Sequence, residues 1–299
     1  MNEKGLTGLA REYHDLDHSG PVSAAHTAFT MNMMKNRYSD VLCIDETRVP
    51  LKLGTRSGDD YIHANYVNFP ELKNKFICTQ GPLPTTRNDF WSMVFQERAE
   101  TILMLCRPNE EGKLKCAVYW PDSGEKLELD TVTVENIGEE ETDFNTVLFR
   151  VSLNDSAKAN CTINTEPLVV KQHRWDKWPD RGIPSHEIAM VPLKLLSYVR
   201  NTQAPCIVHC SAGIGRTGTV IAIEMGIQRQ FCFLYFKIVK DLRKQRAQCI
   251  QTEVQYLYFG RVLVEYAVSQ NLLKDDAKSA ADNFLKEYDS QRKEQMILC

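Results

Sequence analysis

The sequence predicts an α/β fold, a single domain in which helices flank a twisted, mixed β-sheet. Three observations support this prediction. Short apolar runs that are typical of buried strands alternate along the chain with segments of helical periodicity. Two further segments alternate between apolar and polar residues, which indicates an antiparallel hairpin. The 299 residues contain no internal repeat and no linker rich in proline, serine or glycine, so we expect one domain rather than two.

The elements of the first half follow in chain order. "KFICTQG" (75–81) and "TILMLC" (101–106) are predicted to be buried strands. Between them, "TTRNDFWSMVFQERA" (85–99) begins at a threonine and spaces its apolar residues as an amphipathic helix does. "TVTVENI" (131–137) and "TVLFRVSL" (146–153) alternate with period two, and we assign the acidic stretch "GEEETDF" between them to the turn of the hairpin.

The sequence of the second half of the chain predicts more helices than strands. Apolar residues recur at helical spacing from Ile188 onward, and "APCIVHC" (204–210) indicates another buried strand. A largely apolar helix is expected to begin at Arg216. A stripe of apolar residues at four-residue spacing over 254–266 predicts a further helix, and we interpret this stripe as core packing rather than a ligand surface.

Composition excludes several classes of partner. Charged residues make up 25% of the chain and hydrophobic residues 43%, with a formal net charge of −3, which is ordinary for a soluble globular protein. Nothing in the overall charge favours nucleic acid or an anionic membrane as a partner, so any anion site has to be local. No apolar run approaches the length of a membrane span.

The cysteines indicate a reducing environment. Ten of them are scattered along the chain without a C-x-x-C pair, and the first residues, "MNEKGLTGLAREY", do not resemble an export leader. Mostly buried free thiols are typical of intracellular proteins. We therefore expect a monomeric, cytoplasmic protein, or the intracellular part of a larger one.

The stretch "IVHCSAGIGRTGTVIA" (207–222) carries the strongest functional signal. It leads from a strand through a glycine-rich turn into a helix. Gly213 and Gly215 permit backbone geometry that is closed to other residues and leave the turn unobstructed. The amides from Ser211 to Arg216 can then converge in front of the helix, where the positive end of its dipole lies. This arrangement predicts an anion-binding site suited to phosphate.

Cys210 and Arg216 suggest phosphoryl transfer at that site. The helix dipole and Arg216 both favour the thiolate form of Cys210, and the planar guanidinium of Arg216 can grip two phosphate oxygens. A thiolate below a held phosphorus is a nucleophile, and its attack gives a cysteinyl-phosphate. A metal site built from Cys206, His209 and Cys210 is disfavoured because strand geometry points His209 away from Cys210 and no second cluster completes it.

"HCSAGIGRTG" resembles the H-C-x5-R-[ST] signature of the cysteine-based protein tyrosine phosphatases, in which the histidine, here His209, supports the loop. The resemblance extends from about Phe29 to Ala267 in the order of the family. It implies a phosphatase domain over 1–270, followed by a charged helix or tail over 271–299, and it implies neither a metal nor another cofactor. The loop residues implied to bind phosphate are Ser211, Ala212, Gly213, Ile214, Gly215 and Arg216.

Other motifs that resemble the family line the implied pocket. "KNRYSDV" (35–41) resembles the phosphotyrosine-recognition segment, so Tyr38 is implied to stack on the substrate ring and Asp40 to hold backbone amides of the substrate peptide. Taken alone, Tyr38 is better explained as a core tyrosine beside a helix end. "GKLKCAVYWP" resembles the segment that carries a lysine at the pocket rim, here Lys115. Glu110 is implied to pair with Arg216, although the adjacent Glu111 is an alternative.

"WDKWPDRGIP" (175–184) resembles the mobile acid loop of the family, and Asp180 is implied to be the general acid. Trp178 and Pro179 complete the motif, which decides for Asp180 over the nearby Asp176. General acid catalysis of this kind contributes on the order of 10²–10⁴ in rate. The sequence departs from the family in the charged approach to the loop, which is formed by Arg174, Asp176 and Lys177.

"QTEVQY" (251–256) resembles the glutamine loop. Gln251 and Gln255 are implied to position the hydrolytic water, and Thr217 to donate to the departing thiolate of Cys210. His63 stands where the family usually has asparagine, and Gln248 lies near the position that sets the width of the pocket mouth.

Three functions are compatible with these motifs. The first is hydrolysis of phosphotyrosine in proteins through a cysteinyl-phosphate. The second is a pseudophosphatase that binds phosphotyrosine without turnover; the presence of Cys210, Asp180 and Arg216 argues against it. The third is the same chemistry on phosphoserine, phosphothreonine or an inositol phospholipid. A shallow pocket without a "KNRY" wall would favour these substrates, and the presence of "KNRY" here argues against them. We predict the first, with phosphotyrosine-containing proteins as partners.

Overall fold

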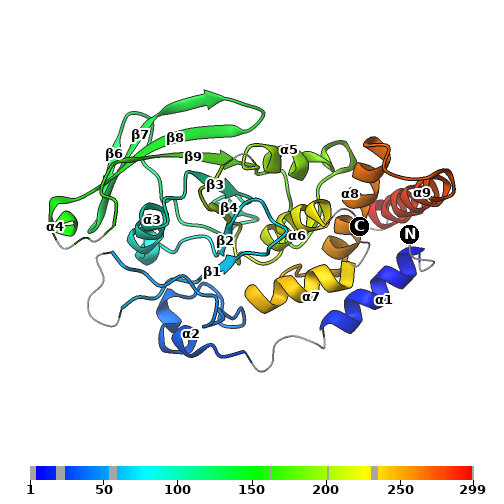
Figure 1. The fold of residues 1–299 in the computed structure, drawn as a ribbon, viewed down its shortest axis with the longest axis horizontal. Helices are drawn as coiled ribbons and strands as arrows, with labels where there is room; N and C mark the ends of the chain where they lie inside the picture. Colours follow the sequence, from blue (N-terminus) through cyan, green and yellow to red (C-terminus); the bar gives the residue numbers. More distant parts are fainter. Residues whose placement is uncertain are drawn as a thin grey trace.

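The structure is a computed structural model that describes residues 5–17, 24–53, 59–159, 161, 163–200, 202–229 and 235–297. Two cysteines counted in the sequence, Cys232 and Cys299, lie outside these residues. The described chain forms one mixed sheet with helices around it (Figure 1), which confirms the predicted fold class. No helix in the described part of the chain is long and apolar enough to cross a membrane.

Within the described residues the main sheet has the strand order β1-β2-β10-β3-β9-β8-β7-β6. The central neighbours β2, β10, β3 and β9 run parallel, whereas β1 and the strands from β8 to β6 pair antiparallel. A separate hairpin is formed by β4 and β5. The strands are β1 Ala64–Val67, β2 Phe76–Thr79, β3 Thr101–Met104, β4 Asn109–Glu110, β5 Lys113–Leu114, β6 Lys126–Glu128, β7 Val132–Glu141, β8 Asn145–Leu153, β9 Leu168–Arg174 and β10 Cys206–His209.

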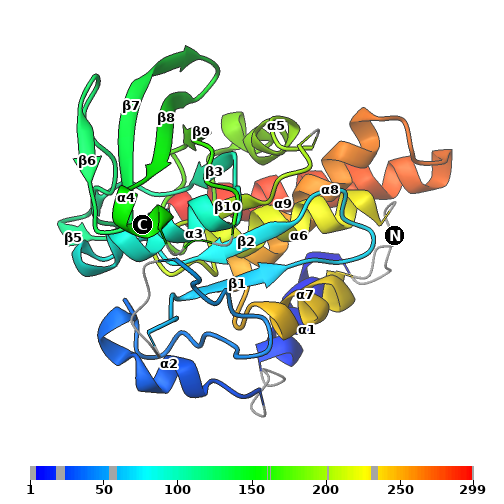
Figure 2. The ribbon, with the colours of Figure 1, turned by 60° about the vertical axis from the view of Figure 1, so that its left-hand side comes forward.

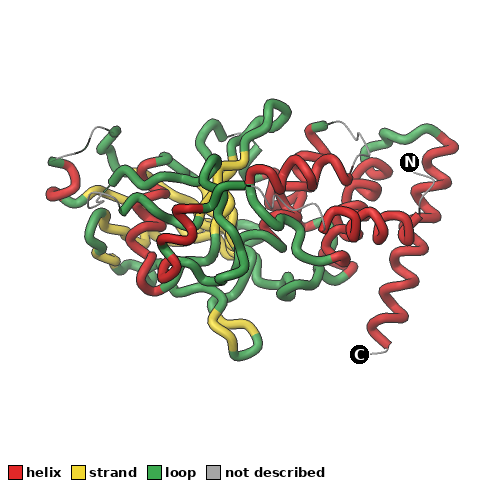
Figure 3. The backbone as a smooth tube through the Cα atoms, turned by 90° about the horizontal axis from the view of Figure 1, so that it is seen from below, coloured by secondary structure: helices red, strands yellow, loops and turns green. Residues whose placement is uncertain are grey.

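The helices gather mainly at one end of the molecule. Figure 1 shows α1, α8 and α9 at the end opposite the β7–β8 hairpin, and Figure 3 shows the same separation from below. Helix α7 lies along β1 in Figure 2, and α6 packs against β10 and β2. The helices are α1 Gly5–Asp17, α2 Thr27–Met31, α3 Arg87–Gln96, α4 Asp155–Lys158, α5 Val191–Ser197, α6 Arg216–Gln228, α7 Tyr235–Gln245, α8 Glu253–Ser269 and α9 Asp275–Ile297.

Burial explains why the central strands read as continuous apolar runs. Every residue of β2, β3 and β10 is buried. Parallel strands in the middle of a sheet have both faces covered, so neither face has to be polar. The three predicted buried strands and the helix between the first two, now α3, are therefore confirmed. Helix α3 is preceded by a 3₁₀ turn over Pro84–Thr86, so its α-helical part begins later than predicted.

The predicted antiparallel hairpin is confirmed, but the prediction that "GEEETDF" forms its turn is wrong. Strand β7 continues through Glu141, and Glu139 and Glu140 pair with β8. The register shifts between Asn136 and Gly138, whose φ of 128° is open to glycine. The acidic side chains remain at the surface, and Glu140 pairs with Lys171 of β9 at 2.7 Å. Charge therefore marked a solvent-facing strand rather than a turn.

The charge-rich C-terminal segment forms α9, which packs against α8 and α1. Ala281 and Tyr288 are buried in this contact. Asp289 lies 3.6 Å from the guanidinium of Arg261 on α8 and 3.3 Å from the ring of His186. The segment is thus a helix with one side held against the domain, rather than a helix exposed on every side.

Two buried histidines make the stability of the fold depend on pH. Burial, and in addition the charge of Arg246, lowers the pKa of His63 to about 3. Burial lowers the pKa of His173 to about 4. The pKa of a histidine in the unfolded chain is near 6.5. Between pH 6.5 and about 4 these two histidines are therefore protonated in the unfolded chain but not in the folded one. The free energy of unfolding therefore falls as the pH drops through this window, by up to about 1.4 kcal/mol per pH unit for each histidine.

Urea unfolding at pH 7.5 and pH 5.5 measures this dependence. We expect the parent to lose stability on acidification, and the variants His63→Asn and His173→Gln each to lose less over the same interval. Equal losses in the parent and in both variants would contradict the assignment to these two residues.

Candidate functional site

The turn between β10 and α6 requires glycine at its centre. Gly213 has a φ of 70°, and a Cβ at this position would lie 2.1 Å from the carbonyl oxygen of Thr79. The backbone amide of Gly213 donates to the sulfur of Cys210 at 3.3 Å. The turn therefore folds its amides back toward the cysteine, as the spacing of the glycines predicts.

Cys210 lies at the base of a cavity of about 550 Å³ and is only 3% exposed. Parts of the chain that are far apart in sequence meet around this cavity. The predicted site residues that line it are Tyr38, Asp40, Lys115, Asp180, Cys210, Ser211, Ala212, Gly215, Arg216, Gln251 and Gln255. Gly213 and Ile214 belong to the turn but do not line the cavity, and the side chain of Ile214 packs instead on Val41 and Ala212.

Arg216 is held from behind by a bidentate ion pair. Its two terminal nitrogens lie 2.6 and 3.0 Å from the carboxylate oxygens of Glu110, and one of them also donates to the carbonyl of Trp178 at 2.9 Å. Burial acts to lower the pKa of Arg216, but the hydrogen bonds to Glu110 and nearby negative charge outweigh it, so the pKa is raised. Arg216 is 1% exposed and stays charged. The structure selects Glu110 over Glu111, the alternative that the sequence left open.

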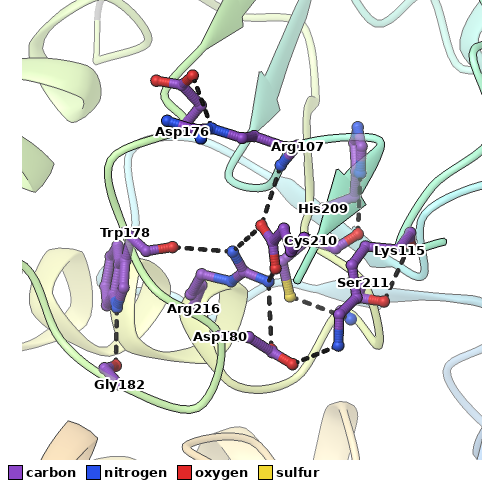
Figure 4. Close-up of polar contacts among 12 residues, drawn as sticks. Arg107, Lys115, Asp176, Trp178, Asp180, Gly182, His209, Cys210, Ser211 and Arg216 are labelled. Atoms are coloured by element: carbon purple, nitrogen blue, oxygen red, sulfur yellow. Dashed lines mark hydrogen bonds and ion pairs between the residues drawn. The ribbon is translucent and has the colours of Figure 1, made fainter. Parts of the chain in front are cut away.

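Asp180 faces the same guanidinium from the cavity side (Figure 4). Its carboxylate lies 3.2 Å from Arg216 and 2.6 Å from the ammonium of Lys115. Burial acts to raise the pKa of Asp180, but the hydrogen bond from Lys115 and the charges of Arg216 and Lys115 outweigh it, so the pKa is lowered. The carboxylate of Asp180 thus pairs with two cations that are also suited to bind an anion.

The predicted acid loop, residues 175–184, contributes Asp180 and Arg181 to the lining of the cavity and is anchored by hydrogen bonds at its far side. The indole of Trp178 is buried and donates to the carbonyl of Gly182 at 2.9 Å. Thr252 donates to the carbonyl of Arg181 at 3.1 Å, and Gln255 donates to that of Gly182 at 3.3 Å. Pro179 follows Trp178 on the outer side of the loop, where it lines two cavities other than the one that contains Cys210.

The two glutamines lie directly in front of the phosphate loop. The backbone amide of Gln251 donates to the side-chain oxygen of Gln255 at 3.0 Å, which ties the Gln255 side chain to the start of this segment. A Cβ on Gly215 would lie 3.1 Å from side-chain atoms of both, which shows how closely they approach the loop. Thr252 caps α8 by accepting from the amide of Gln255.

Tyr38 also lines the cavity. Its hydroxyl donates to Ser211 at 2.8 Å, and Ser211 in turn donates to the carbonyl of Lys115 at 2.9 Å. Asp40 is exposed at the rim, and its backbone carbonyl accepts from the side chain of Gln248 at 3.0 Å. The recognition segment and the segment that carries Gln248 are therefore joined at the mouth of the cavity.

The comparisons with known proteins agree with this geometry. The family model described as protein-tyrosine phosphatase matches residues 32–265. This chain belongs to the protein-tyrosine phosphatase family. The receptor-type tyrosine-protein phosphatase eta of Mus musculus is 37% identical over 277 residues, which cover 90% of this chain and 22% of that protein. The tyrosine-protein phosphatase non-receptor type 9 of Homo sapiens is 34% identical over 302 residues, which cover 91% of this chain and 48% of that protein.

A solved structure places this phosphatase-family chain among known folds. The structure of PTPN18 in complex with HER2-pY1196 phosphopeptides superposes with a TM-score of 0.74 at 31% identity, covering 87% of this chain and 92% of that one. The chain thus matches nearly a whole phosphatase domain in that structure. By contrast, it spans about a fifth of the receptor-type relative and about half of the non-receptor one.

His209, a predicted supporting residue of this phosphatase domain, ends β10 before the loop, and Thr217, a predicted catalytic residue, lies in α6 after it. His209 is buried and accepts from the hydroxyl of Tyr119 at 2.8 Å, while its other ring nitrogen donates to the carbonyl of Cys210 at 3.2 Å. Gln172 donates to the same tyrosine at 2.5 Å, which fixes these donor roles. Thr217 is different: its buried hydroxyl has no hydrogen-bond partner among the described residues, so its implied bond to Cys210 is not formed here.

Sequence reasoning missed the residue that holds the phosphate loop from below. Arg246 is fully buried and donates to the carbonyls of Gly213 at 3.1 Å and Ala212 at 2.9 Å. It also donates to the ring of His63 at 3.1 Å, and the other nitrogen of that ring donates to the carbonyl of Val41 at 2.8 Å. A buried arginine in "RKQRAQC" has no local pattern to mark it, and only the unusual histidine at position 63 hinted at altered bonding.

No metal site is apparent in the part of the chain that the structure describes. Clusters of three or more histidine, cysteine, aspartate or glutamate side chains suited to a metal ion are absent from the described residues. The cavity instead offers an arginine, a lysine and a loop of backbone amides, which are donors for an anion.

Proposed function

We propose that this domain hydrolyses phosphotyrosine in proteins through a cysteinyl-phosphate intermediate. One observation carries the proposal: Cys210 lies at the base of a single cavity that also brings together Arg216, Asp180 and Tyr38. These residues supply a nucleophile, a phosphate ligand, an acid and an aromatic wall. Membership of the protein-tyrosine phosphatase family supports the same activity.

In the first step the thiolate of Cys210 attacks phosphorus along the axis of the tyrosine oxygen. An S–P bond forms while the P–O bond to tyrosine breaks, and Asp180 gives its proton to the departing phenolic oxygen. Arg216 and the loop amides hold the three remaining oxygens of the phosphoryl group, where charge is concentrated. Stabilisation of this kind is electrostatic and positional.

Substrate binding is expected to convert Asp180 from an ion-pair partner into an acid. Asp180 now lies 3.2 Å from Arg216, and a phosphate dianion in the cavity competes for that guanidinium. Because the dianion brings negative charge close to Asp180, it raises the pKa of this carboxyl. The proton that the leaving group needs is therefore held at Asp180 only when substrate is bound.

In the second step Asp180 acts as a base. It takes a proton from a water molecule whose oxygen attacks phosphorus, the S–P bond breaks, and the thiolate of Cys210 returns with release of phosphate. Gln251 and Gln255 orient that water, since both line the cavity and their side chains face the loop at Gly215. Thr217 is proposed to turn its hydroxyl toward the leaving sulfur.

The aromatic residue in the cavity lining supports phosphotyrosine over phosphoserine. Tyr38 lines the same cavity as Cys210 and Asp180, so its ring is available to contact the ring of a phosphotyrosine. We propose phosphotyrosine-containing proteins as substrates and, following the non-receptor and receptor-type relatives, an intracellular setting. PTPN18, the structural neighbour, is solved in complex with phosphopeptides.

One observation favours a second function, a pseudophosphatase that binds phosphotyrosine without turnover. The ion pairs with Lys115 and Arg216 lower the pKa of Asp180, which disfavours the protonated form that the acid step requires. If the phosphate did not displace Asp180 from these cations, the site would bind its ligand but fail to protonate the leaving group.

Phosphate release from a phosphotyrosine peptide in EDTA, beside a matched phosphoserine peptide, tests the proposal. We expect turnover of the phosphotyrosine peptide, unchanged by the chelator and at least about 10²-fold faster than that of the phosphoserine peptide. Tight binding of the phosphotyrosine peptide without turnover would favour the pseudophosphatase. Loss of activity in EDTA would contradict the metal-free mechanism.

A further inference from the structure

We infer that the ion pair between Arg107 and Asp176 positions the acid loop, so that both are positioning residues for proton transfer by Asp180. This inference rests on the proposed function. The two side chains are 69 positions apart in the chain, and their charged groups lie 3.0 Å apart. Neither side chain lines the cavity that contains Cys210, so any effect they have on catalysis is exerted through the loop.

The pair stands where the acid loop leaves the sheet. Strands β3 and β9 are parallel neighbours with Met104 opposite Arg174. The last backbone hydrogen bond between them runs from the amide of Trp175 to the carbonyl of Met104, at 2.9 Å. Asp176 is the first residue beyond that bond, and Arg107 follows the end of β3. The ion pair therefore continues the link between the two strands past the point where the backbone ladder stops (Figure 4).

Arg107 is also hydrogen-bonded to Glu110, the residue that holds Arg216 in place. Its backbone amide donates to Glu110 at 3.0 Å, and the same carboxylate oxygen lies 2.6 Å from the guanidinium of Arg216. The start of the acid loop is thus fixed to the segment that fixes Arg216. Asp180 has to reach the phenolic oxygen of a phosphoryl group that Arg216 holds. Proton transfer therefore needs Asp180 and Arg216 to be fixed to the same support.

The other end of the loop has its own anchors, which are the hydrogen bonds from Thr252 and Gln255 to the backbone of Arg181 and Gly182. At the start of the loop, Trp178 contributes one carbonyl to Arg216, and the Arg107–Asp176 pair is the charged side-chain contact. The two side chains are 58% and 50% exposed, so the pair is a modest one that shifts the equilibrium constant between the open and closed loop about two- to fivefold.

The test uses neutral variants and a charge swap. Arg107→Gln and Asp176→Asn each remove one charge, the double variant removes both, and Arg107→Asp combined with Asp176→Arg restores the pair in reverse. We expect each single variant to lower kcat for phenyl phosphate, whose poor leaving group needs the acid, about two- to fivefold. The double variant should lose no more than a single one, and the swapped pair should recover most of the loss.

Leaving-group dependence separates positioning from general damage. p-Nitrophenyl phosphate has a good leaving group that depends less on the acid, so its kcat should change less than that of phenyl phosphate. The matched control is Glu135→Gln, which breaks the ion pair with Arg150 on the β7–β8 hairpin, 2.9 Å long and similarly placed at the surface. This variant should leave both rates unchanged.

Limited trypsin digestion provides a readout that needs no activity. Lys177 and Arg181 are exposed cleavage sites within the acid loop. Native-state cleavage follows the open population of a segment, so both neutral variants should be cut at Arg181 faster than the parent; the swapped pair is left out of this assay because Arg at position 176 adds a trypsin site.

The outcomes distinguish the inference from the proposed function. A parent that turns over neither phosphate ester, with faster loop cleavage in the variants, would refute the proposed activity and retain the role of the ion pair in loop closure. An active parent would overturn the inference if the losses for the two esters were equal, if the single losses added in the double variant, or if loop cleavage were unchanged.

Discussion

Replacement of Cys210 by serine is expected to abolish phosphate release from phosphotyrosine peptides, to below about 10⁻³ of the parent rate. The hydroxyl of serine is a far weaker nucleophile than a thiolate, while the loop that binds phosphate remains intact. The Cys210→Ser variant should therefore still bind the phosphotyrosine peptide. Turnover and peptide binding, measured on the same preparation, check both parts of this prediction.

Other thiols near the site cannot replace Cys210. Burial raises the pKa of Cys249 to about 12 and that of Cys206 further still, so both remain protonated. Cys161, which is half-buried and does not line the cavity, gives a control: Cys161→Ser should keep the full rate. Residual turnover by Cys210→Ser comparable to that of the parent would show that this sulfur is not the nucleophile.

Replacement of Asp180 by asparagine is expected to lower kcat for phosphotyrosine by about 10²–10⁴. Asparagine keeps the shape of the side chain but has no proton to give to a phenolic oxygen. A general acid works only when protonated, so kcat/KM of the parent should fall as the pH rises through the pKa of Asp180 in the free enzyme. The ion pairs lower that pKa, which predicts an optimum on the acid side.

The Asp180→Asn variant should lack this falling limb of the pH profile. Asp176→Asn is the matched comparison, because it removes a carboxylate four residues away that lies outside the cavity. Its loss should be far smaller, and its falling limb should persist. If Asp176→Asn lost more activity than Asp180→Asn, the assignment of the acid would have to be exchanged.

The sequence predicts those parts of the fold that depend on local pattern. The buried strands were recognisable because parallel central strands carry an unbroken apolar run, and the turn before α6 because glycine alone suits its φ of 70° at Gly213. The extent of the turn between β7 and β8 could not be recognised from the sequence, since Glu139 and Glu140 suit an exposed strand as well as a loop. In this segment the acidic residues indicate exposure to solvent, but they do not indicate whether the backbone is a strand or a turn.

Within the site, the sequence by itself determined the segments that carry their chemistry in adjacent residues: the phosphate loop with Cys210 and Arg216, and the Trp178-Pro179-Asp180 stretch. Only the tertiary structure decided which groups meet them. It selected Glu110 for Arg216, placed Arg246 beneath the loop and set Asp176 against Arg107. The physical reason is that local sequence fixes local backbone geometry, whereas the order of strands in the sheet decides which distant side chains come within hydrogen-bonding reach.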